Sequence, residues 1–302
     1  MVKTILMIKS DYLKFLKKKE AGGRPIVDKI GKLKKFYLPL SKWIYSIYLK
    51  DKKTKIIGLS GGQGAGKSTI TDILKFIFKR KYNLDLCVFS IDDFYKTKSE
   101  RIKMSKAIHP LFLTRGVPGT HDIKLLNKVI QNLKKKNFKK VLVPKFDKSI
   151  DDRFKKVKWQ KIKTAPKIII LEGWCVGAIE QKKGELVKPI NKIEKKLDPR
   201  MIWRKKVNNF LKNEYKKVFK KIDKLVYLKV PDFNHIFKWR LVQEQKLKLT
   251  SKSKKTMSKA EVREFIMFYE RITRHMMKNF FKISDLTIFL DKNHRSKKMK
   301  FL

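Results

Sequence analysis

A glycine-rich stretch near residue 60 carries the residue types that bind phosphate. Gly61 to Ser68 follow the pattern G-x-x-x-x-G-K-[ST] without a mismatch. In such a loop the backbone N–H groups point at phosphate oxygens, the lysine reaches the β- and γ-phosphates, and the serine hydroxyl ligates Mg²⁺. The sequence therefore predicts a site for a nucleotide and Mg²⁺. Its expected ligands are Gly61, Gly62, Gln63, Gly64, Ala65, Gly66, Lys67, Ser68 and Thr69.

The residues on either side of this loop are those that a phosphate site requires. The apolar run Ile56–Leu59 predicts a short buried strand, and apolar residues recur at helical spacing between residues 70 and 78. The N-terminus of that helix would add a positive end to the loop. A glycine-rich turn before an ordinary helix is the alternative, but the order of strand, loop and helix favours phosphate binding.

Acidic residues follow two further apolar runs. Asp92 comes after the run 84–91, and Glu172 comes after the run 167–171. In an open α/β sheet, ligands bind at the carboxyl ends of the strands, so both carboxylates are expected near the phosphates. Glu172 is suited to hold Mg²⁺ or its water, whereas Asp92 could instead cap a helix.

A kinase for a small hydroxyl compound needs a base beside the acceptor, an acid that holds the metal, and a mobile cationic lid. Asp92, Glu172 and Arg240 occur in suitable places, and Arg240 precedes a lysine-rich stretch at 246–256. A GTPase switch would usually carry the motif Asn-Lys-x-Asp, which the chain lacks. A small-molecule kinase is therefore the favoured class of P-loop protein.

Strand and helix patterns alternate along the chain, which predicts an α/β protein with the P-loop NTPase fold. We expect a mostly parallel sheet with helices on both faces, a helical N-terminal lead-in and a helical lid. Residues 1–53 are expected to be a helical extension on a kinase domain of residues 54–302, with Ser41 as a helix N-cap. Further strands are expected at 141–144, 225–230 and 286–290, helices at 123–133, 207–219 and 262–276, and a surface excursion at 180–200.

The composition limits the partners. The net charge is +51, from 66 lysines and 12 arginines against 27 acidic residues, and lysine pairs are spread along the whole chain. A nucleic-acid face would concentrate them and favour arginine, so no specific nucleic-acid partner is expected. No apolar run approaches the roughly 18 residues of a membrane span. Cys87 and Cys175 lie in apolar runs as expected free thiols, and a cytoplasmic location is expected.

Several stretches together resemble the plant-type D-glycerate 3-kinases and their bacterial relatives. These belong to the superfamily of phosphoribulokinase, uridine kinase and pantothenate kinase. The resemblance extends from about residue 36 to 295, and its most specific parts are Arg115–Asp122 and Glu172–Ala178. The matching stretches are Phe36–Leu40, Gly61–Ser68, Ser90–Tyr95, Thr114–Asp122, Phe146–Ser149, Leu171–Ala178, Phe237–Glu244 and Tyr269–Arg274.

The resemblance implies ATP and Mg²⁺ as cofactors and glycerate as the acceptor, with 3-phosphoglycerate as the product. By position, Asp92 corresponds to the general base, Glu172 to the metal-associated acid and Arg240 to the lid arginine that meets the phosphates. The implied residues of the acceptor pocket are Arg115, His121, Asp147 and Arg153. For His121, a hydrogen-bonded loop histidine is an equal alternative.

Other assignments stay open at this point. The acceptor could be a compound like pantothenate, uridine or ribulose phosphate, and either carboxylate could be the base while the other holds the metal. A regulatory ATP-binding protein would keep Lys67 but would need no base at Asp92. A nucleic-acid kinase would use the basic surface. The sequence leaves the oligomeric state undetermined.

Overall fold

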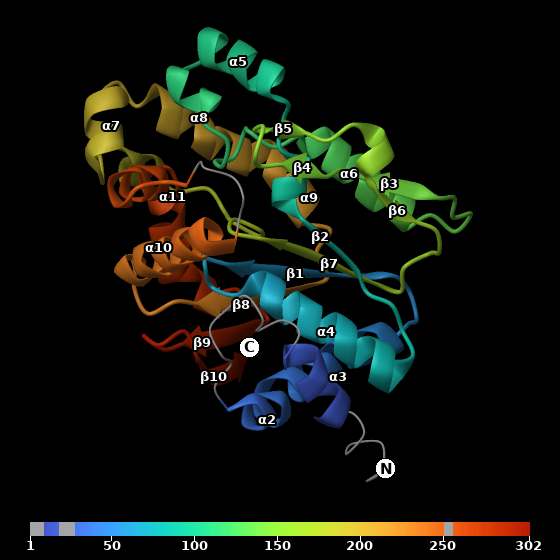
Figure 1. The fold of residues 1–302 in the computed structure, drawn as a ribbon. Helices are drawn as coiled ribbons and strands as arrows, with labels where there is room; N and C mark the ends of the chain where they lie inside the picture. The colour runs from blue at the N-terminus through green and yellow to red at the C-terminus, as the bar shows by residue number, and fades with distance from the viewer. Residues whose placement is uncertain (1–8, 18–27, 251–255) are drawn as a thin grey trace.

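The chain folds around one central sheet (Figure 1). The computed structural model describes residues 9–17, 28–250 and 256–302. Six strands lie in the order β10–β9–β8–β1–β7–β2, and neighbours run parallel except for β10, which is antiparallel to β9. The strands are β1 (Lys55–Gly61), β2 (Cys87–Ser90), β7 (Ile168–Gly173), β8 (Lys224–Lys229), β9 (Leu286–Leu290) and β10 (Ser296–Phe301).

The central strands are apolar on both sides because both faces of the sheet are covered. Alternate residues point to opposite faces, so Ile56 and Ile169 join one core cluster, while Ile57 and Ile170 join the other. The first cluster includes residues of α6 (Ile123–Leu133), α8 (Ile202–Phe210) and α9 (Lys216–Phe219); the second includes residues of α3 (Leu38–Leu49) and α4 (Lys67–Tyr82). The predicted α/β fold is confirmed.

The N-terminal residues of the described chain are helical and pack on the face that carries α4 (Figure 1). Residues 9–17 form a helix, followed by α2 (Lys29–Lys32), the π-helix η1 (Leu33–Tyr37) and α3. The predicted N-cap at Ser41 is wrong. Ser41 is buried inside α3 and its hydroxyl donates to the carbonyl of Leu38 at 2.8 Å. The π turn before α3 carries the helix through Pro39, which lacks an N–H group to donate.

Two short antiparallel pairs lie outside the main sheet. The strand expected at 141–144 is β3 (Val141–Val143), which pairs with β6 (Gln160–Ile162) and does not join the parallel sheet. Between them, β4 (Phe146–Asp147) pairs with β5 (Asp152–Arg153). The remaining elements of this half are η2 (Ile91–Phe94), α5 (Lys98–Ala107), η3 (Pro110–Leu113) and η4 (Lys156–Lys158).

The segment 180–200 is less exposed than its lysines suggest. It contains η5 (Lys183–Leu186) and α7 (Lys192–Leu197), and it buries Glu194 and Asp198. Both acids meet buried arginines: Arg271 bonds Glu194 at 2.6 Å and Arg204 bonds Asp198 at 3.1 Å. The prediction of a mere surface excursion is therefore wrong, because buried ion pairs anchor the segment, one of them to Arg271, 77 residues along the chain.

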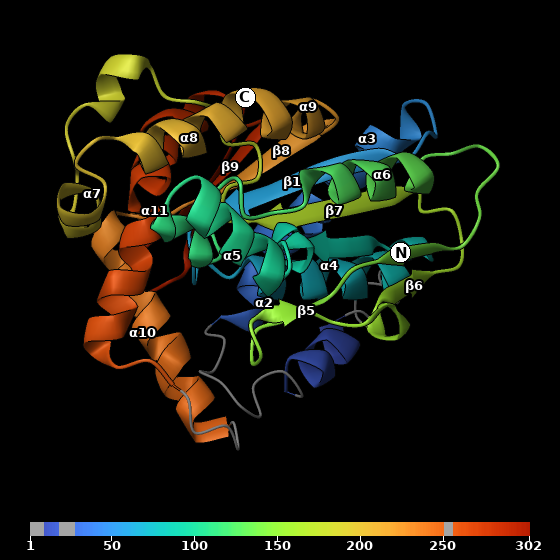
Figure 2. The same ribbon diagram turned by 90° about the horizontal axis from the view of Figure 1, so that it is seen from above.

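The C-terminal half of the chain contains two long helices. α10 (Phe233–Thr250) and α11 (Lys259–Asn279) pack side by side (Figures 1 and 2). The predicted capping box is confirmed, since Ser258 and Glu261 each accept a hydrogen bond from the other's backbone N–H. The expected loop at 246–256 begins as helix up to Thr250, and residues 251–255 lie outside the described chain. The other helical pieces are η6 (Leu211–Tyr215) and η7 (Phe280–Lys282).

Within the described residues, no helix combines the length and apolarity needed to cross a lipid bilayer.

Candidate active site

The glycine-rich loop connects the end of β1 to the start of α4. Gly64 and Gly66 have φ angles of 76° and 88°, a conformation that other residues adopt only with strain. A Cβ atom on Gly64 would also lie 2.9 Å from Cβ of Trp239 in α10. The loop therefore curls tightly against the helix pair, as a phosphate cradle requires.

Lys67 is the first residue of α4 and points back over the loop. Its Nζ donates to the carbonyls of Gly61 and Gly62 at 2.8 and 3.1 Å. Burial lowers the pKa of Lys67, although the carboxylates of Glu172 and Asp92 oppose this shift. A triphosphate in the loop would provide the negative charge that this ammonium lacks among its direct partners.

Glu172 lies opposite Ser68, at the end of β7. The Ser68 hydroxyl donates to Oε1 of Glu172 at 3.0 Å, while Oε2 is buried without a partner among the described residues. Burial raises the pKa of Glu172, and Lys67 and the Ser68 hydroxyl act against it. A hydroxyl and a carboxylate with one uncommitted oxygen fit Mg²⁺, which binds one or two protein oxygens beside phosphates. No cluster of three or more His, Cys, Asp or Glu with metal-binding geometry occurs in the described chain.

Asp92 lies after the end of β2, the neighbour of β7 in the sheet. It is the second residue of the turn η2, whose N-cap Ser90 accepts a hydrogen bond from the N–H of Asp92. Oδ1 accepts from the Tyr95 hydroxyl at 3.0 Å and Oδ2 from Lys148 Nζ at 3.2 Å. Burial raises the pKa of this carboxyl, but the nearby ammonium groups of Lys148 and Lys67 outweigh it and hold the pKa below its usual value. Asp92 is therefore ionised and can accept a proton at neutral pH.

The adjacent Asp93 has different contacts. Its Oδ2 accepts from the backbone N–H of Ser90 at 3.2 Å and from Lys145 Nζ at 2.8 Å. It thereby closes the capping box of η2. The two carboxylates that are paired in sequence are thus separated in space: Asp93 holds the turn, and Asp92 faces Lys67 and Glu172.

His121 lies behind Asp92. It is 1% exposed, its ring stacks on Tyr95 with centroids 4.5 Å apart, and its Nδ1 is 2.7 Å from the Tyr215 hydroxyl. The same hydroxyl accepts the N–H of Gly119, so the histidine is part of the framework of the loop. Burial lowers the pKa of His121 to about 4, which keeps the ring neutral. This geometry favours the reading of a hydrogen-bonded loop histidine over contact with the acceptor.

Arg115 lies at the rim of the site. Its guanidinium is paired with the carboxylate of Asp151 and lies over the ring of Phe146, 5.5 Å from the centroid. Asp151 also pairs with the fully buried Arg101 at 2.9 Å. The carboxylate of Asp151 therefore forms ion pairs with two arginines. The side chain of Arg115 is about a quarter exposed.

The other two residues expected in the acceptor pocket are committed to local structure. Arg153 donates through Nε and Nη2 to the carbonyl of Tyr95 at 3.2 and 2.8 Å, and lies 3.4 Å from Asp122. Asp147 accepts from both the N–H and the hydroxyl of Ser149 at 2.9 and 2.5 Å. Arg153 therefore ties β5 to the strand-end loop, and Asp147 shapes the turn between β4 and β5.

Arg240 of α10 lies above the site. It pairs with Glu244 at 2.6 Å, one turn further along the helix, and its guanidinium lies over the ring of Phe265 in α11. Tyr269 of α11 also comes down to the site, where its hydroxyl donates to the carbonyl of Arg115 at 3.3 Å. A Cβ on Gly116 would lie 2.3 Å from that hydroxyl, so the loop needs glycine there.

Three side chains of the site were not predicted from the sequence. Tyr95 and Lys148 bond Asp92 directly, and Tyr269 approaches the loop from α11. Tyr95 and Lys148 lie in the matching stretches 90–95 and 146–149, but only the acids of those stretches were singled out. Nothing in the spacing indicated that the lysine, rather than Asp147, faces the candidate base.

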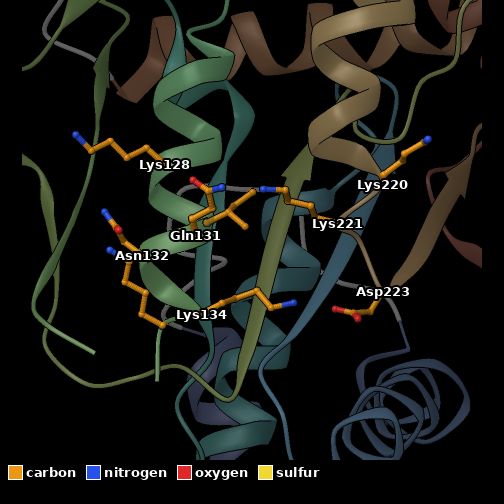
Figure 3. Close-up of a pocket in the computed structure, with 9 residues that line it drawn as sticks. Lys128, Gln131, Asn132, Lys134, Lys220, Lys221 and Asp223 are labelled. Carbon is orange, nitrogen blue, oxygen red and sulfur yellow. The ribbon is translucent and has the colours of Figure 1, made fainter. Parts of the chain in front are cut away.

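A separate cavity of about 910 Å³ opens at the opposite edge of the sheet (Figure 3). It lies at the amino ends of the strands, because Asp223 in its wall accepts a hydrogen bond from the N–H of Ile56 at the start of β1. Ligands of parallel sheets bind at the carboxyl ends, and this cavity contains no glycine loop or candidate base. Its lining consists of Lys128, Ile130, Gln131, Asn132, Lys134, Lys135, Lys220, Lys221 and Asp223.

Known proteins resemble this chain over most of its length. An uncharacterized kinase of Schizosaccharomyces pombe, mug58, is 37% identical over 224 residues, which cover 71% of this chain and 78% of that protein. The chloroplastic D-glycerate 3-kinase of Arabidopsis thaliana is 29% identical over 257 residues, or 79% of this chain. The chain spans about half of the plant protein, 53% of its length.

The fold has a match of similar extent. The solved structure of a D-glycerate 3-kinase from Cryptococcus neoformans superposes with a TM-score of 0.74 at 21% identity, over 88% of this chain and 99% of that one. The profile of the phosphoribulokinase/uridine kinase family matches residues 56–198, the segment that carries the glycine-rich loop, Asp92 and Glu172. The chain belongs to the phosphoribulokinase/uridine kinase family of P-loop kinases.

Proposed function

We propose that this small-molecule kinase transfers the γ-phosphoryl group of ATP to the 3-hydroxyl of D-glycerate and releases 3-phosphoglycerate and ADP. The observation that carries the proposal is the position of Asp92, an ionised carboxylate beside Lys67 at the carboxyl edge of the sheet. The choice of acceptor is supported by the likeness to the Arabidopsis D-glycerate 3-kinase at 29% identity.

The donor side of the reaction is assigned to the glycine-rich loop. The N–H groups of residues 61–69 would bind the phosphates of ATP, and Lys67 would leave the carbonyls of Gly61 and Gly62 for the β- and γ-phosphates. Ser68 and Glu172 would hold Mg²⁺, which supplies charge neutralisation at the phosphates when it is bound. Arg240 would exchange Glu244 for a phosphate oxygen as the helix pair settles over the nucleotide.

The acceptor side is assigned to Asp92. Its carboxylate would take the proton of the 3-hydroxyl as that oxygen attacks the γ-phosphorus, and the bond from phosphorus to the bridging oxygen of ADP breaks. Tyr95 orients the carboxylate through Oδ1. Arg115 forms the rim on the acceptor side, whereas His121, Asp147 and Arg153 keep the surrounding loops in position.

The test is an assay of ADP release with a panel of acceptors. D-glycerate, uridine, pantothenate and ribulose 5-phosphate are compared at equal ATP and Mg²⁺, and the product is identified by phosphorus NMR. We expect D-glycerate to have the highest kcat/KM and to give 3-phosphoglycerate. Uridine or pantothenate turned over at least as well, or 2-phosphoglycerate as the product, would leave only the family assignment.

A further inference from the structure

A kinase acting on glycerate must also bind the carboxylate of its acceptor, and an arginine is the usual partner for that group. The arginines near Asp92 are already engaged. Arg115 is paired with Asp151, Arg153 donates to the carbonyl of Tyr95, and Arg240 pairs with Glu244. Among the lysines, Lys67 faces the glycine loop and Lys145 pairs with Asp93.

Lys148 differs from these cations because its partner is the candidate base itself. Its ammonium contacts the Oδ2 atom of Asp92 at 3.2 Å, a longer contact than the 2.8 Å pair of Lys145 with Asp93. The side chain is 63% exposed, so it is accessible from solvent. Lys148 also lowers the pKa of Lys67, which indicates that both ammonium groups lie in one site.

The turn that carries Lys148 has a defined shape. Asp147 accepts two hydrogen bonds from Ser149, and Asp151 has a φ of 56° and anchors the far side of the turn to Arg101. The backbone of the turn is thus held while the four-carbon side chain of the lysine keeps its freedom. A lysine on such a support can follow a small anion without a movement of the loop.

We infer that Lys148 binds the carboxylate of the acceptor and thereby selects an anionic substrate. This inference rests on the proposed function. The geometry allows it because ordinary bond lengths place a carboxylate oxygen of glycerate about 3 to 5 Å from its 3-hydroxyl oxygen, depending on the rotation about its carbon–carbon bonds. A hydroxyl bonded to Asp92 therefore brings the carboxylate within reach of the ammonium that now touches that same aspartate. Binding of the acceptor would exchange one carboxylate partner of Lys148 for another.

The test is a thermodynamic cycle in which two forms of the enzyme, with and without the Lys148 ammonium, are each compared on two acceptors. Wild type and Lys148→Met are assayed with D-glycerate and with D-glyceramide, its uncharged amide, at saturating ATP. We expect the variant to lose about 10- to 100-fold in kcat/KM for D-glycerate, the range of a charge-assisted hydrogen bond. The kcat/KM for the amide should change by less than about 3-fold, because the uncharged amide forms no ion pair with Lys148. The change in basicity of Asp92 affects both acceptors alike and cancels in the cycle.

Three controls make the outcome decisive. Lys155→Met removes the same charge from an exposed position shortly after β5 and should leave the preference for D-glycerate intact. Lys148→Gln serves if the methionine variant does not fold, and an unchanged KM for ATP shows an intact donor site. If the wild type does not turn over the amide, Lys148→Met must still raise the KM for D-glycerate by the same factor.

Two results would overturn the inference while glycerate kinase activity stands. An equal loss with both acceptors would mean that Lys148 acts on Asp92 or on the phosphoryl group. An unchanged KM for D-glycerate in Lys148→Met would mean that another cation binds the carboxylate. A wild type without activity on D-glycerate would instead contradict the proposed function itself.

Discussion

The two edges of the central sheet are both rich in lysine, yet they differ in how their charges are held. At the carboxyl edge, the ammonium groups of Lys67, Lys145 and Lys148 each have a partner within 3.2 Å. At the amino edge, Lys128, Lys134 and Lys220 of the 910 Å³ cavity are exposed, and Lys221 reaches into the hollow (Figure 3) and donates to the amide oxygen of Asn127. Paired, partly buried charge distinguishes the first edge, whereas the second has volume and positive charge alone.

The difference shows that cavity size and net charge are poor guides to the active site of this protein. With a formal charge of +51, a surface hollow lined by lysines is expected from composition alone. What the carboxyl edge adds is a set of charged groups close together: Glu172 with one buried oxygen that has no partner among the described residues, Lys67 and an ionised Asp92. Charged groups gathered in this way, with shifted pKa values, are typical of a functional site.

The largest effect is expected from Lys67→Ala. This change removes the ammonium that would stabilise the β- and γ-phosphates, and kcat/KM for ATP should fall by about 10³-fold or more. The fold should survive, because the hydrogen bonds of the Lys67 side chain to other described residues go to the loop carbonyls of Gly61 and Gly62. Lys75→Ala, an exposed position on the same helix, is the matched control. Retained turnover in Lys67→Ala would contradict the assignment of the ATP site to the carboxyl edge.

Asp92→Asn should follow in size. The amide cannot accept the acceptor proton, so kcat should fall by about 10²-fold or more while the KM for ATP changes little. Asp93→Asn, which alters the adjacent but structural carboxylate, should cost less in kcat and more in stability. Loss of Mg-ATP binding in Asp92→Asn, with near-normal single-turnover chemistry, would make Asp92 a metal ligand and leave the base to another residue.

The elements that the sequence predicted best are those whose pattern and position agree. The glycine loop, the apolar strands β1 and β7 and the capping box of α11 all depend on residues close together in the chain. The prediction of Ser41 as an N-cap was wrong because the capping rule considers only the local sequence, whereas Ser41 is buried inside α3. The pairing of β3 with β6 and of the buried Glu194 with Arg271 joins separate elements, which periodicity does not indicate.

The candidate site shows the same limit. Asp92 and Glu172 were predictable because strand ends meet at one edge of a parallel sheet. The contacts of Lys148 and Tyr269 depend on how a short hairpin and α11 fold back over that edge, and no spacing rule encodes this. Arg153 has the right charge for an acceptor pocket, but its donors are taken by Tyr95 and Asp122.

A third prediction tests whether water is excluded from His121 at the carboxyl edge. The pKa of buried His121 is lowered to about 4, from about 6.5 when the chain is unfolded. The unfolded chain then binds the extra proton as the pH falls below 6.5, so this residue destabilises the fold progressively between pH 6.5 and 4. Between pH 7.5 and 5.5 the free energy of unfolding should fall by about 1 kcal/mol through His121 alone. Urea denaturation of wild type and His121→Gln measures this difference, and an identical pH dependence in both would place His121 in water.

The smallest effect is expected at the amino edge. Lys128, Lys134 and Lys220 line the cavity and are exposed, so replacing all three by glutamine removes charge without breaking a buried contact. The seven residues of β1 separate the cavity from the glycine loop by about 20 Å. That is more than twice the Debye length of about 8 Å at physiological salt, so kcat/KM for ATP should change by less than about 2-fold. At about 0.01 M salt the screening length grows to about 30 Å, and the KM for ATP should then rise modestly in the triple variant. A several-fold rise at physiological salt would show that the two edges act on the same anion.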